Sequence, residues 1–489
     1  MAATFSPPTL LKFAPLAVLL FGGCATVPDL GPRPALREAA SVAATQSLPG
    51  SDAGAWPGPG LWASYGDPQL AALIEEALRN SPDVAAALAR VRQAEGFAQQ
   101  AGASRLPSLD VQGQAGLDKQ SSNNGIPAQF IPNGWNDRAQ VAAVLGFDLD
   151  LWGRNRAALA AAVSEQRAAT IDAAQAQLLL SAAVAATYSD LGTAFAEQDV
   201  RRRALAVRQA SRDLIARRFD NGLENRGSVR QGDAEVARAG ADLARADADI
   251  ALRRHQLAAL VGAGPDRGLA ISRPALSAVP LRALPRDVTT DLVGRRPDIV
   301  AARERTEAAA QRIKVARADF YPAIRLDALV GLQSLGFGNL ANSGSTYGSV
   351  GPAISLPIFH GGAIEGGYRN ARGRFDEAVA DYDRTVVDAY RQVADAVTGT
   401  RTAAVTLGDA RTALAASEDA YKIAQDRYRG GLANYLAVLT VEDRLLAARE
   451  AVAMAEAAVR SNDIALLRAL GGGFTSNGST GQRKGSPDA

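Results

Sequence analysis

The feature that most constrains the fold is an uninterrupted run of 67 residues, Gly153 to Phe219, that contains no proline. Alanine dominates the run and its larger apolar residues recur at helical spacing, so it predicts one continuous helix. At a rise of about 1.5 Å per residue, this helix would be roughly 100 Å long, several times the diameter of an ordinary domain. A second run of the same kind occupies Gly361 to Tyr428. Two rods of this length favour a long tube or bundle over a compact enzyme.

Four shorter segments alternate between apolar and polar residues with a period of two. In the first of them, Leu109 and Val111 alternate with Asp110 and Gln112. A period of two over about ten residues is typical of strands that cross a bilayer in a barrel. The strands are expected at 107–118, 139–152, 323–333 and 346–359. Their polar face would carry Asp110, Gln112, Gln114, Asp148, Asp150, Arg325 and Asp327, and Trp152 would lie in an interfacial aromatic belt.

The second half of the chain repeats the pattern of the first. Pro82-Asp83-Val84 recurs as Pro297-Asp298-Ile299 at an offset of 215, and Gly222-Leu223 recurs as Gly431-Leu432 at an offset of 209. An internal duplication is the economical explanation. The predicted fold is therefore mainly α with a β-barrel part, in which each chain supplies long helices and four strands.

The duplication gives the predicted domain organisation. The segments outside the repeats are a signal peptide at 1–23, an N-terminal tether at 24–60, a linker at 263–290 and a disordered tail at 472–489. The first repeat, 61–262, holds a helix ending near residue 105, the first two strands, the long helix 153–219 and a return helix at 227–262. The second repeat, 291–471, holds helix 297–320, the other two strands, the long helix 361–428 and a return helix at 434–470.

Four strands cannot close a barrel. An open sheet edge in lipid leaves backbone groups unpaired at several kcal/mol each, so other copies of the chain must complete the barrel. Two chains would give eight strands, whose interior side chains nearly fill the barrel, and three would give twelve, wide enough for an aqueous lumen. The polar inward face favours a barrel with an aqueous lumen. Strand counting alone excludes only the monomer.

The N-terminus has the composition of a secretory signal. Residues 10–21 form an apolar run too short to span a bilayer as a helix, and Gly22 and Gly23 precede the single cysteine, Cys24. Small residues directly before a cysteine resemble a bacterial lipobox, and Ala25 resembles the pattern sorted to the outer membrane. Cys24 is therefore expected to carry acyl chains, palmitate among them, that hold the mature N-terminus at the membrane. The alternative is a plain cleaved signal with an incidental cysteine.

Charge and composition exclude several classes of function. The 53 Lys and Arg residues nearly balance the 51 Asp and Glu residues, so there is no electrostatic footprint for nucleic acid. One cysteine and two histidines are too few for a Cys/His metal site or a disulfide framework. No nucleophile and base constellation or phosphate-binding loop appears either, so neither an enzyme nor a cofactor is expected.

Several motifs together resemble the outer-membrane factor family, and within it the NodT-type lipoproteins, which are relatives of TolC. These motifs are Asp67-Pro68-Gln69-Leu70, Leu149-Asp150-Leu151-Trp152-Gly153-Arg154, Arg295-Arg296-Pro297-Asp298-Ile299 and the lipobox. The resemblance implies the exit duct of a multidrug-resistance efflux pump of the resistance-nodulation-division class. It implies a homotrimer with a twelve-stranded barrel in the outer membrane and a helical tunnel in the periplasm. The implied partners are outer-membrane lipid, a periplasmic membrane-fusion adaptor and an inner-membrane pump.

The resemblance also implies two functional regions at the helix-turn-helix tips. Adaptor docking is expected at Asn221, Gly222, Leu223, Gly430, Gly431 and Leu432, where the glycines also serve as helix caps. Family members often narrow the tip with acidic residues, but the matching positions here are Ala437 and Thr440. The candidate gate residues are instead those close to the tip, namely Leu223, Arg230, Gln231, Tyr435 and Leu436.

Two other functions are alternatives to a passive efflux duct. One is the outer-membrane channel of a type I protein secretion system, and the other is a periplasm-spanning scaffold that does not conduct. Polar inner faces on four strands favour a duct over a scaffold, since a scaffold needs only a lipid anchor and helices. The transported substrate cannot be read from the chain.

Overall fold

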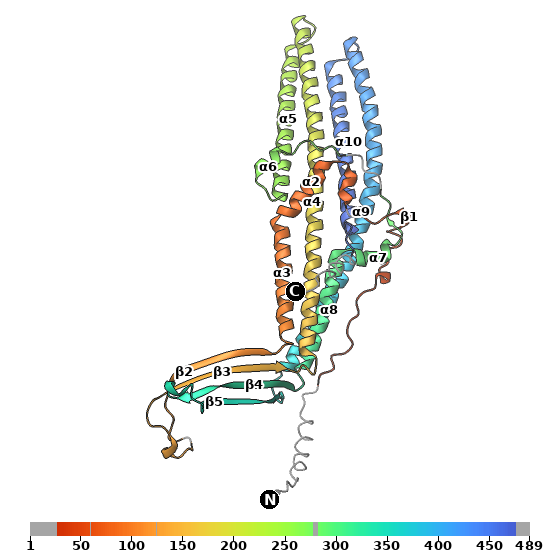
Figure 1. The fold of residues 1–489 in the computed structure, drawn as a ribbon. Helices are drawn as coiled ribbons and strands as arrows, with labels where there is room; N and C mark the ends of the chain where they lie inside the picture. The colour runs from red at the N-terminus through yellow and green to blue at the C-terminus, as the bar shows by residue number, and fades with distance from the viewer. Residues whose placement is uncertain (1–26, 59, 124, 277–281, 476–489) are drawn as a thin grey trace. The chain divides into compact units, whose positions relative to one another are not determined.

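The computed structural model describes residues 27–58, 60–123, 125–276 and 282–475. Long helices and one antiparallel sheet make up most of the described chain (Figure 1). The chain divides into two compact units. Of the described residues, the first unit, which we call the sheet unit, comprises those up to Ala35, together with Arg92–Ala168 and Arg303–Asp381. The second, the hairpin unit, comprises those in Leu36–Val91, in Ala169–Ala302 and from Tyr382 to Thr475.

Matching helices in the two halves have equal lengths. Helices α3 (Pro82–Ala103) and α8 (Pro297–Ala318) each have 22 residues. Helices α4 (Arg154–Asp220) and α9 (Ala363–Arg429) each have 67. Helices α5 (Arg226–Leu260) and α10 (Tyr435–Ala469) each have 35. The internal duplication and the two long rods that the sequence predicts are therefore confirmed.

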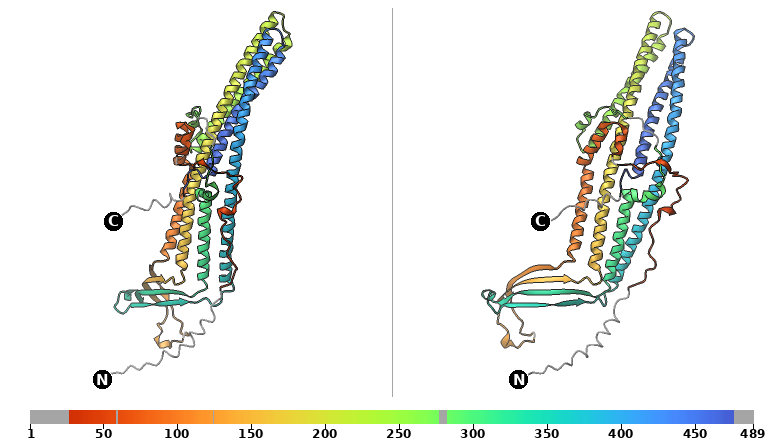
Figure 2. Two further views of the ribbon diagram at one scale, coloured as in Figure 1. Left: turned by 90° about the vertical axis from the view of Figure 1, so that its right-hand side faces the viewer. Right: turned by 45° about the vertical axis from the view of Figure 1, so that its right-hand side comes forward.

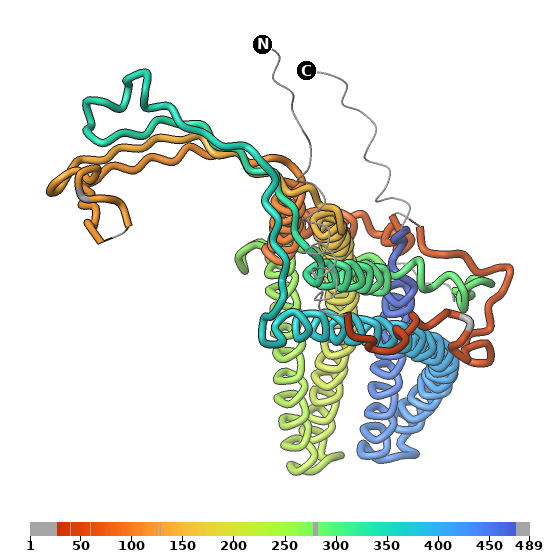
Figure 3. Tube along the Cα trace, turned by 90° about the horizontal axis from the view of Figure 1, so that it is seen from below, coloured from red at the N-terminus to blue at the C-terminus, as the bar shows by residue number. Residues whose placement is uncertain are grey.

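The sheet unit is built around four strands, β2 (Ser108–Asp118), β3 (Asn136–Asp148), β4 (Ala323–Leu335) and β5 (Thr346–Ser355). They lie in the order β2-β3-β4-β5, each pair is antiparallel, and the sheet is visibly curved (Figure 3). Strands β3 and β5 end earlier than the predicted 139–152 and 346–359. Short 3-10 turns, η4 (Ala128–Phe130) and η5 (Phe337–Asn339), lie in the β2–β3 and β4–β5 connections.

In the hairpin unit, the ends of the long helices form two helical hairpins, α4 with α5 and α9 with α10 (Figure 2). Asparagine caps start both return helices. Asn225 Oδ1 accepts a hydrogen bond from the amide of Ser228, and Asn434 Oδ1 accepts one from the amide of Ala437, each at 3.0 Å. These caps satisfy amides that the first turn of a helix leaves without partners.

Among the residues that the structure describes, three hydrophobic cores stabilise the hairpin unit. The first packs α2 (Pro68–Asn80) and Tyr65 against α4 and α5, the second packs α7 (Val288–Arg295) against α9, and the third lies near the hairpin ends. By length and composition α4 could cross a membrane, but 56% of its most apolar window is buried inside the protein. Its alanines therefore serve close helix packing.

The segments predicted as a tether and a linker contain regular structure. Within the tether, η2 (Ala39–Ser41) and β1 (Ser51–Gly54) form, and Leu48 is buried. A short helix, η3 (Leu61–Tyr65), follows. The linker contains α6 (Pro265–Leu269), and residues Ser51 and Gly54 bridge to Pro285 in it. Contacts between segments distant in sequence order these stretches, which local composition does not predict.

Candidate functional site

The strand register separates an apolar face from a mostly polar face, on which Val144 pairs with Leu329. Directly paired residues lie on the same face, and Val111 pairs with Ala143, which pairs with Val330. On the other face, Gln112 pairs with Ala142 and Asp110 with Val144. The apolar face is largely exposed at Leu109, Val111, Leu117, Val330, Val350 and Ile354. An exposed apolar face of this extent fits contact with lipid, and a polar opposite face fits a wet lumen.

The polar face carries six of the seven residues that the alternation assigns to it. Asp150 is the exception, because β3 ends two residues before it and its backbone has φ +45°. Its carboxylate accepts hydrogen bonds from the amides of Asn155 and Arg156 at 2.9 and 3.0 Å. The assignment of Asp150 to the lumen is therefore wrong, since this residue caps the start of α4.

The motif that runs from Leu149 to Arg154 forms the turn from β3 to α4. Gly153 has φ +75°, which a residue with a side chain rarely adopts. The ring of Trp152 stacks on Tyr321 with 4.7 Å between centroids, and its Nε1 donates to the carbonyl of Pro322 at 2.7 Å. Arg154 pairs with Asp319 at 3.3 Å. The turn thus joins the end of β3 to the residues that precede β4.

The two hairpin tips share one backbone geometry. Gly222 and Gly431 have φ +72° and +73°. The amide of Leu223 donates to the carbonyl of Arg218, and that of Leu432 donates to the carbonyl of Arg427, both at 2.8 Å. Together with the bonds from the two glycine amides, these are Schellman caps, which the glycines make possible. Both leucines remain exposed, so each tip presents an apolar side chain held by a rigid turn.

The candidate gate residues lie in different environments. Tyr435 is buried and packs near Tyr428, with 5.9 Å between the ring centroids, while Arg218 lies over the Tyr428 ring. Leu223 and Leu436 are exposed. Arg230 pairs with Asp233 at 3.2 Å, and Gln231 is exposed. Within one chain, Tyr435 is a packing residue, and the role of the other four as a gate stays a prediction.

A buried ion pair joins the two hairpins near their tips. Arg208 on α4 and Glu442 on α10 are 6% and 2% exposed at the side chain, and Nε of Arg208 lies 3.3 Å from Oε1 of Glu442. Arg208 also pairs with the exposed Asp443. Neither oxygen of Glu442 has a hydrogen-bond partner within the described chain. Burial raises the pKa of Glu442 to about 7, although Arg208 lowers it.

Sequence reasoning did not single out this pair. The two residues are more than two hundred positions apart, and each lies in a helix rich in charges. The sequence contains one indication that Glu442 is buried, because Glu442 shares a helical face with the apolar residues Val438, Leu439 and Leu445. A carboxylate on an apolar stripe indicates a buried partner.

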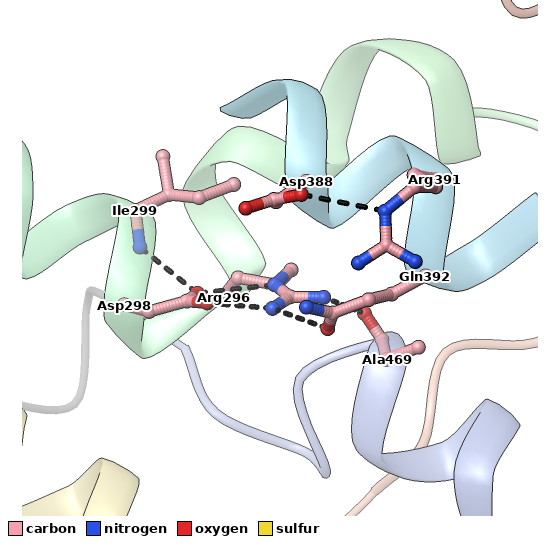
Figure 4. A network of polar contacts seen from close by, with 7 residues as sticks. All are labelled: Arg296, Asp298, Ile299, Asp388, Arg391, Gln392 and Ala469. Atoms are coloured by element: carbon pink, nitrogen blue, oxygen red, sulfur yellow. Dashed lines mark hydrogen bonds and ion pairs between the residues drawn. The ribbon is translucent and has the colours of Figure 1, made fainter. Parts of the chain in front are cut away.

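The run from Arg295 to Ile299 forms a structural clamp (Figure 4). The buried guanidinium of Arg296 donates to Asp298 Oδ1 at 3.0 Å, to Gln392 Oε1 on α9 at 3.0 Å and to the carbonyl of Ala469 at the end of α10 at 3.1 Å. Arg295 lies over the Trp56 ring at 4.9 Å. This motif therefore fixes the junction of α7 and α8 against α9 and α10.

The motif that starts at Asp67 is also structural. The buried Asp67 accepts hydrogen bonds from the hydroxyl of Tyr188 at 2.6 Å, the amide of Gln69 at 2.9 Å and the amide of Ala275 at 2.7 Å. Cys24, the expected lipidation site, lies outside the described residues, as does most of the predicted tail.

Comparison with known proteins places these features in one family. The family model described as outer membrane efflux protein matches residues 73–263 and 289–472. The chain is 35% identical over 369 residues to the fusaric acid resistance protein FusA of Burkholderia cepacia, covering 72% of this chain and 68% of that protein. It is 28% identical over 362 residues to the multidrug resistance outer membrane protein MdtP of Escherichia coli, covering 72% and 73%. The structure resembles that of the outer membrane protein VceC of Vibrio cholerae with a TM-score of 0.81 and 42% identity, covering 86% of this chain and 100% of that one.

Proposed function

The chain belongs to the outer membrane efflux protein family, and from this premise we propose that it is the outer-membrane channel of a tripartite efflux system. In this proposal it forms a passive duct from the periplasm to the exterior. A periplasmic adaptor and an inner-membrane pump deliver the substrate, and opening requires contact energy from these partners.

The observation that carries the proposal is the register of the sheet. One face is apolar and exposed along four strands, the other is polar, and the outer edges of β2 and β5 have no neighbour within the described chain. Unpaired strand edges cannot remain open in a bilayer. A homotrimer with twelve strands pairs every edge and encloses a lumen wide enough for water.

The connections between strands and helices support a one-sided tunnel. Helices α3 and α8 precede β2 and β4, while β3 and β5 lead into α4 and α9. In an antiparallel sheet of this order, these four ends lie at the same rim. The long helices of three chains would therefore extend the lumen on one side of the membrane, which is the periplasm for an outer-membrane protein.

The names of the relatives support small toxic compounds as the cargo. One relative is named for fusaric acid resistance and another for multidrug resistance. Their names favour the efflux role over a type I protein secretion channel. Acyl chains on Cys24 would add a second attachment to the outer membrane.

Two measurements test the proposal on the full-length protein in detergent. Mass determination is expected to give three chains per particle, and planar-bilayer recording of the trimer with its adaptor and pump is expected to give discrete conductance steps. A monomeric particle would contradict the barrel. A trimer that never conducts, even with its adaptor and pump present, would favour the non-conducting scaffold.

A further inference from the structure

A cavity of about 620 Å³ lies in the sheet unit, between the start of α4 and the end of α8. The α4 side is formed around Gly153 and Ala157, and the α8 side around Ile313 and Ala318. The side chains that give it chemical character are Arg33, Arg156, Lys314, Arg317, Trp152 and Tyr321. We call this cavity the basic rim pocket, because it lies next to the ends of β3 and β4.

The basic rim pocket has an excess of positive charge. Arg156 is paired with Asp150 at 3.1 Å. Arg33, Lys314 and Arg317 are exposed, and none of the three makes an ion pair with another side chain in the described part of the protein. Three uncompensated cations around one cavity favour an anionic occupant, and guanidinium groups suit phosphate oxygens.

An aromatic pair closes one side of the same pocket. Trp152 and Tyr321 are stacked, and the bond from the Trp152 indole to the carbonyl of Pro322 holds the pair against the residue before β4. Trp and Tyr at the end of a membrane strand belong to the interfacial belt, at the level of lipid headgroups. When the sheet spans the outer membrane as the proposed function requires, the pocket lies at the depth of the lipid phosphates.

The pocket is also placed away from the sheet edges that other copies would cover. It lies beside β3 and β4, the two inner strands of the order β2-β3-β4-β5. Arg33 belongs to the N-terminal segment, whose carbonyls at Gly31 and Pro32 accept hydrogen bonds from Arg372 on α9. Cys24 is nine residues before Arg33, a reach of at most about 30 Å. With Cys24 acylated as in the proposed function, the segment that leads from it to Arg33 would lie outside the lumen.

We propose that the basic rim pocket binds the phosphodiester headgroup of an anionic phospholipid from the periplasmic leaflet. Arg33, Lys314 and Arg317 contact the phosphate oxygens, and Trp152 and Tyr321 contact the glycerol and the first methylenes of the acyl chains. This assignment rests on the proposed function, because it requires that this rim faces the periplasmic side of the outer membrane. Basic pockets beside membrane segments bind anionic lipid headgroups in the same way.

The test compares lipids on the full-length protein purified in detergent. Native mass spectrometry measures the apparent Kd for phosphatidylglycerol and for phosphatidylcholine. We expect phosphatidylglycerol to bind at least tenfold more tightly. The triple variant Arg33→Ser, Lys314→Ser, Arg317→Ser is expected to lose at least tenfold in affinity for phosphatidylglycerol and to show no preference between the two lipids.

A matched triple variant removes the same charge elsewhere in the sheet unit. Arg92, Arg303 and Arg374 are exposed cations that do not line the pocket, and their replacement by serine is expected to leave the lipid preference intact. Equal losses in the two triple variants would overturn the proposal, as would an unchanged affinity in the pocket variant. If the pocket variant does not fold, Arg317→Ser alone is measured. A loss of at least threefold in affinity for phosphatidylglycerol is expected, and an unchanged affinity would contradict the site.

A soluble anion provides the last comparison. Glycerophosphoglycerol, the deacylated form of phosphatidylglycerol, carries the same phosphodiester without acyl chains, and it is expected to compete with phosphatidylglycerol only at a concentration at least a hundredfold higher than that of the lipid. Competition at equal concentration would overturn the assignment to a lipid. Conductance is recorded separately with the adaptor and pump present, so a protein that prefers phosphatidylglycerol but never conducts would contradict the duct and leave the lipid site standing.

Discussion

Nε of Arg208 lies 3.3 Å from Oε1 of Glu442, and both side chains are almost fully excluded from solvent. This contact joins α4 of the first hairpin to α10 of the second. The groups that act on the Glu442 carboxyl are Arg208, Asp443 and Glu235. Burial raises the pKa of Tyr421 and of Tyr435, and the charge of Glu442 raises both further. The pair therefore holds a titratable group in the contact between the hairpins.

We expect the free energy of unfolding of the hairpin ends to fall as pH rises. Burial raises the pKa of Glu442 from 4.5 to about 7, so the folded state retains a proton that the unfolded state has lost in this range. The resulting stabilisation is fully present below pH 4.5, decreases between pH 4.5 and 7, and amounts to at most about 3 kcal/mol. Hydrogen exchange of the tip segments at pH 5.5 and 8, corrected for intrinsic rates, measures it.

Glu442→Gln is expected to remove this pH dependence, because its amide stays neutral across the range. Asp443→Asn is the matched control, since Asp443 also pairs with Arg208 but is 70% exposed. This variant is expected to retain most of the pH dependence, because burial is the largest cause of the raised pKa of Glu442. An unchanged pH dependence in Glu442→Gln would contradict the assignment to Glu442.

A second prediction concerns the cap at the start of α4. Asp150→Ala removes the acceptor for the amides of Asn155 and Arg156 and leaves alanine at φ +45°. The loss of the cap and the left-handed backbone together predict a destabilisation of about 2–3 kcal/mol. Asp150→Asn keeps one acceptor oxygen and tolerates this backbone, so its loss is expected to be less than half. Guanidinium titration in detergent measures both, with Asp110→Ala on the open strand face as the control that should change little.

The sequence predicts the parts of the fold that depend on local periodicity. Alternation along β2 assigned Asp110 and Gln112 to one face and Val111 to the other, and the register in the sheet confirms these faces. The long helices follow for the same reason, because a period of 3.6 or 2.0 residues is visible in a short window. The internal duplication follows instead from motifs that recur at offsets of 215 and 209.

Contacts between distant segments could not be predicted in this way. Asp150 continues the alternation of β3, and only the turn at its positive φ shows that it caps a helix. Arg296 was recognised as part of a family motif, but its bonds to Gln392 and to the carbonyl of Ala469 join residues about 100 and 170 positions away. Burial of Glu442 likewise depends on α4, which packs against it only in the folded chain.

The third prediction concerns docking at the tips. Leu223 and Leu432 are 67% and 74% exposed on rigid Schellman turns, and a partner that covers them would gain about 1.5–3 kcal/mol for each leucine. The double variant Leu223→Ser, Leu432→Ser is therefore expected to weaken binding of the adaptor at least tenfold. Surface plasmon resonance with the purified adaptor measures the affinity. Leu252→Ser on α5 removes a leucine that is 62% exposed and should leave binding unchanged. Equal affinities of the double variant and the wild-type protein would contradict docking at these residues.

Adjacent positions on β2 allow a fourth prediction with its own control. Val111 is exposed on the apolar face and Gln112 lies on the polar face, both near the middle of the strand. An arginine at the bilayer midplane costs about 2–4 kcal/mol, so Val111→Arg is expected to reduce the fraction of protein that inserts into the outer membrane. Gln112→Arg introduces the same charge into the lumen, so insertion should be preserved while three added cations per trimer shift the ion selectivity of the pore toward anions. Membrane fractionation measures insertion, and reversal potentials in a salt gradient measure selectivity. Equal insertion of the two variants would mean that the faces of β2 do not separate lipid from water.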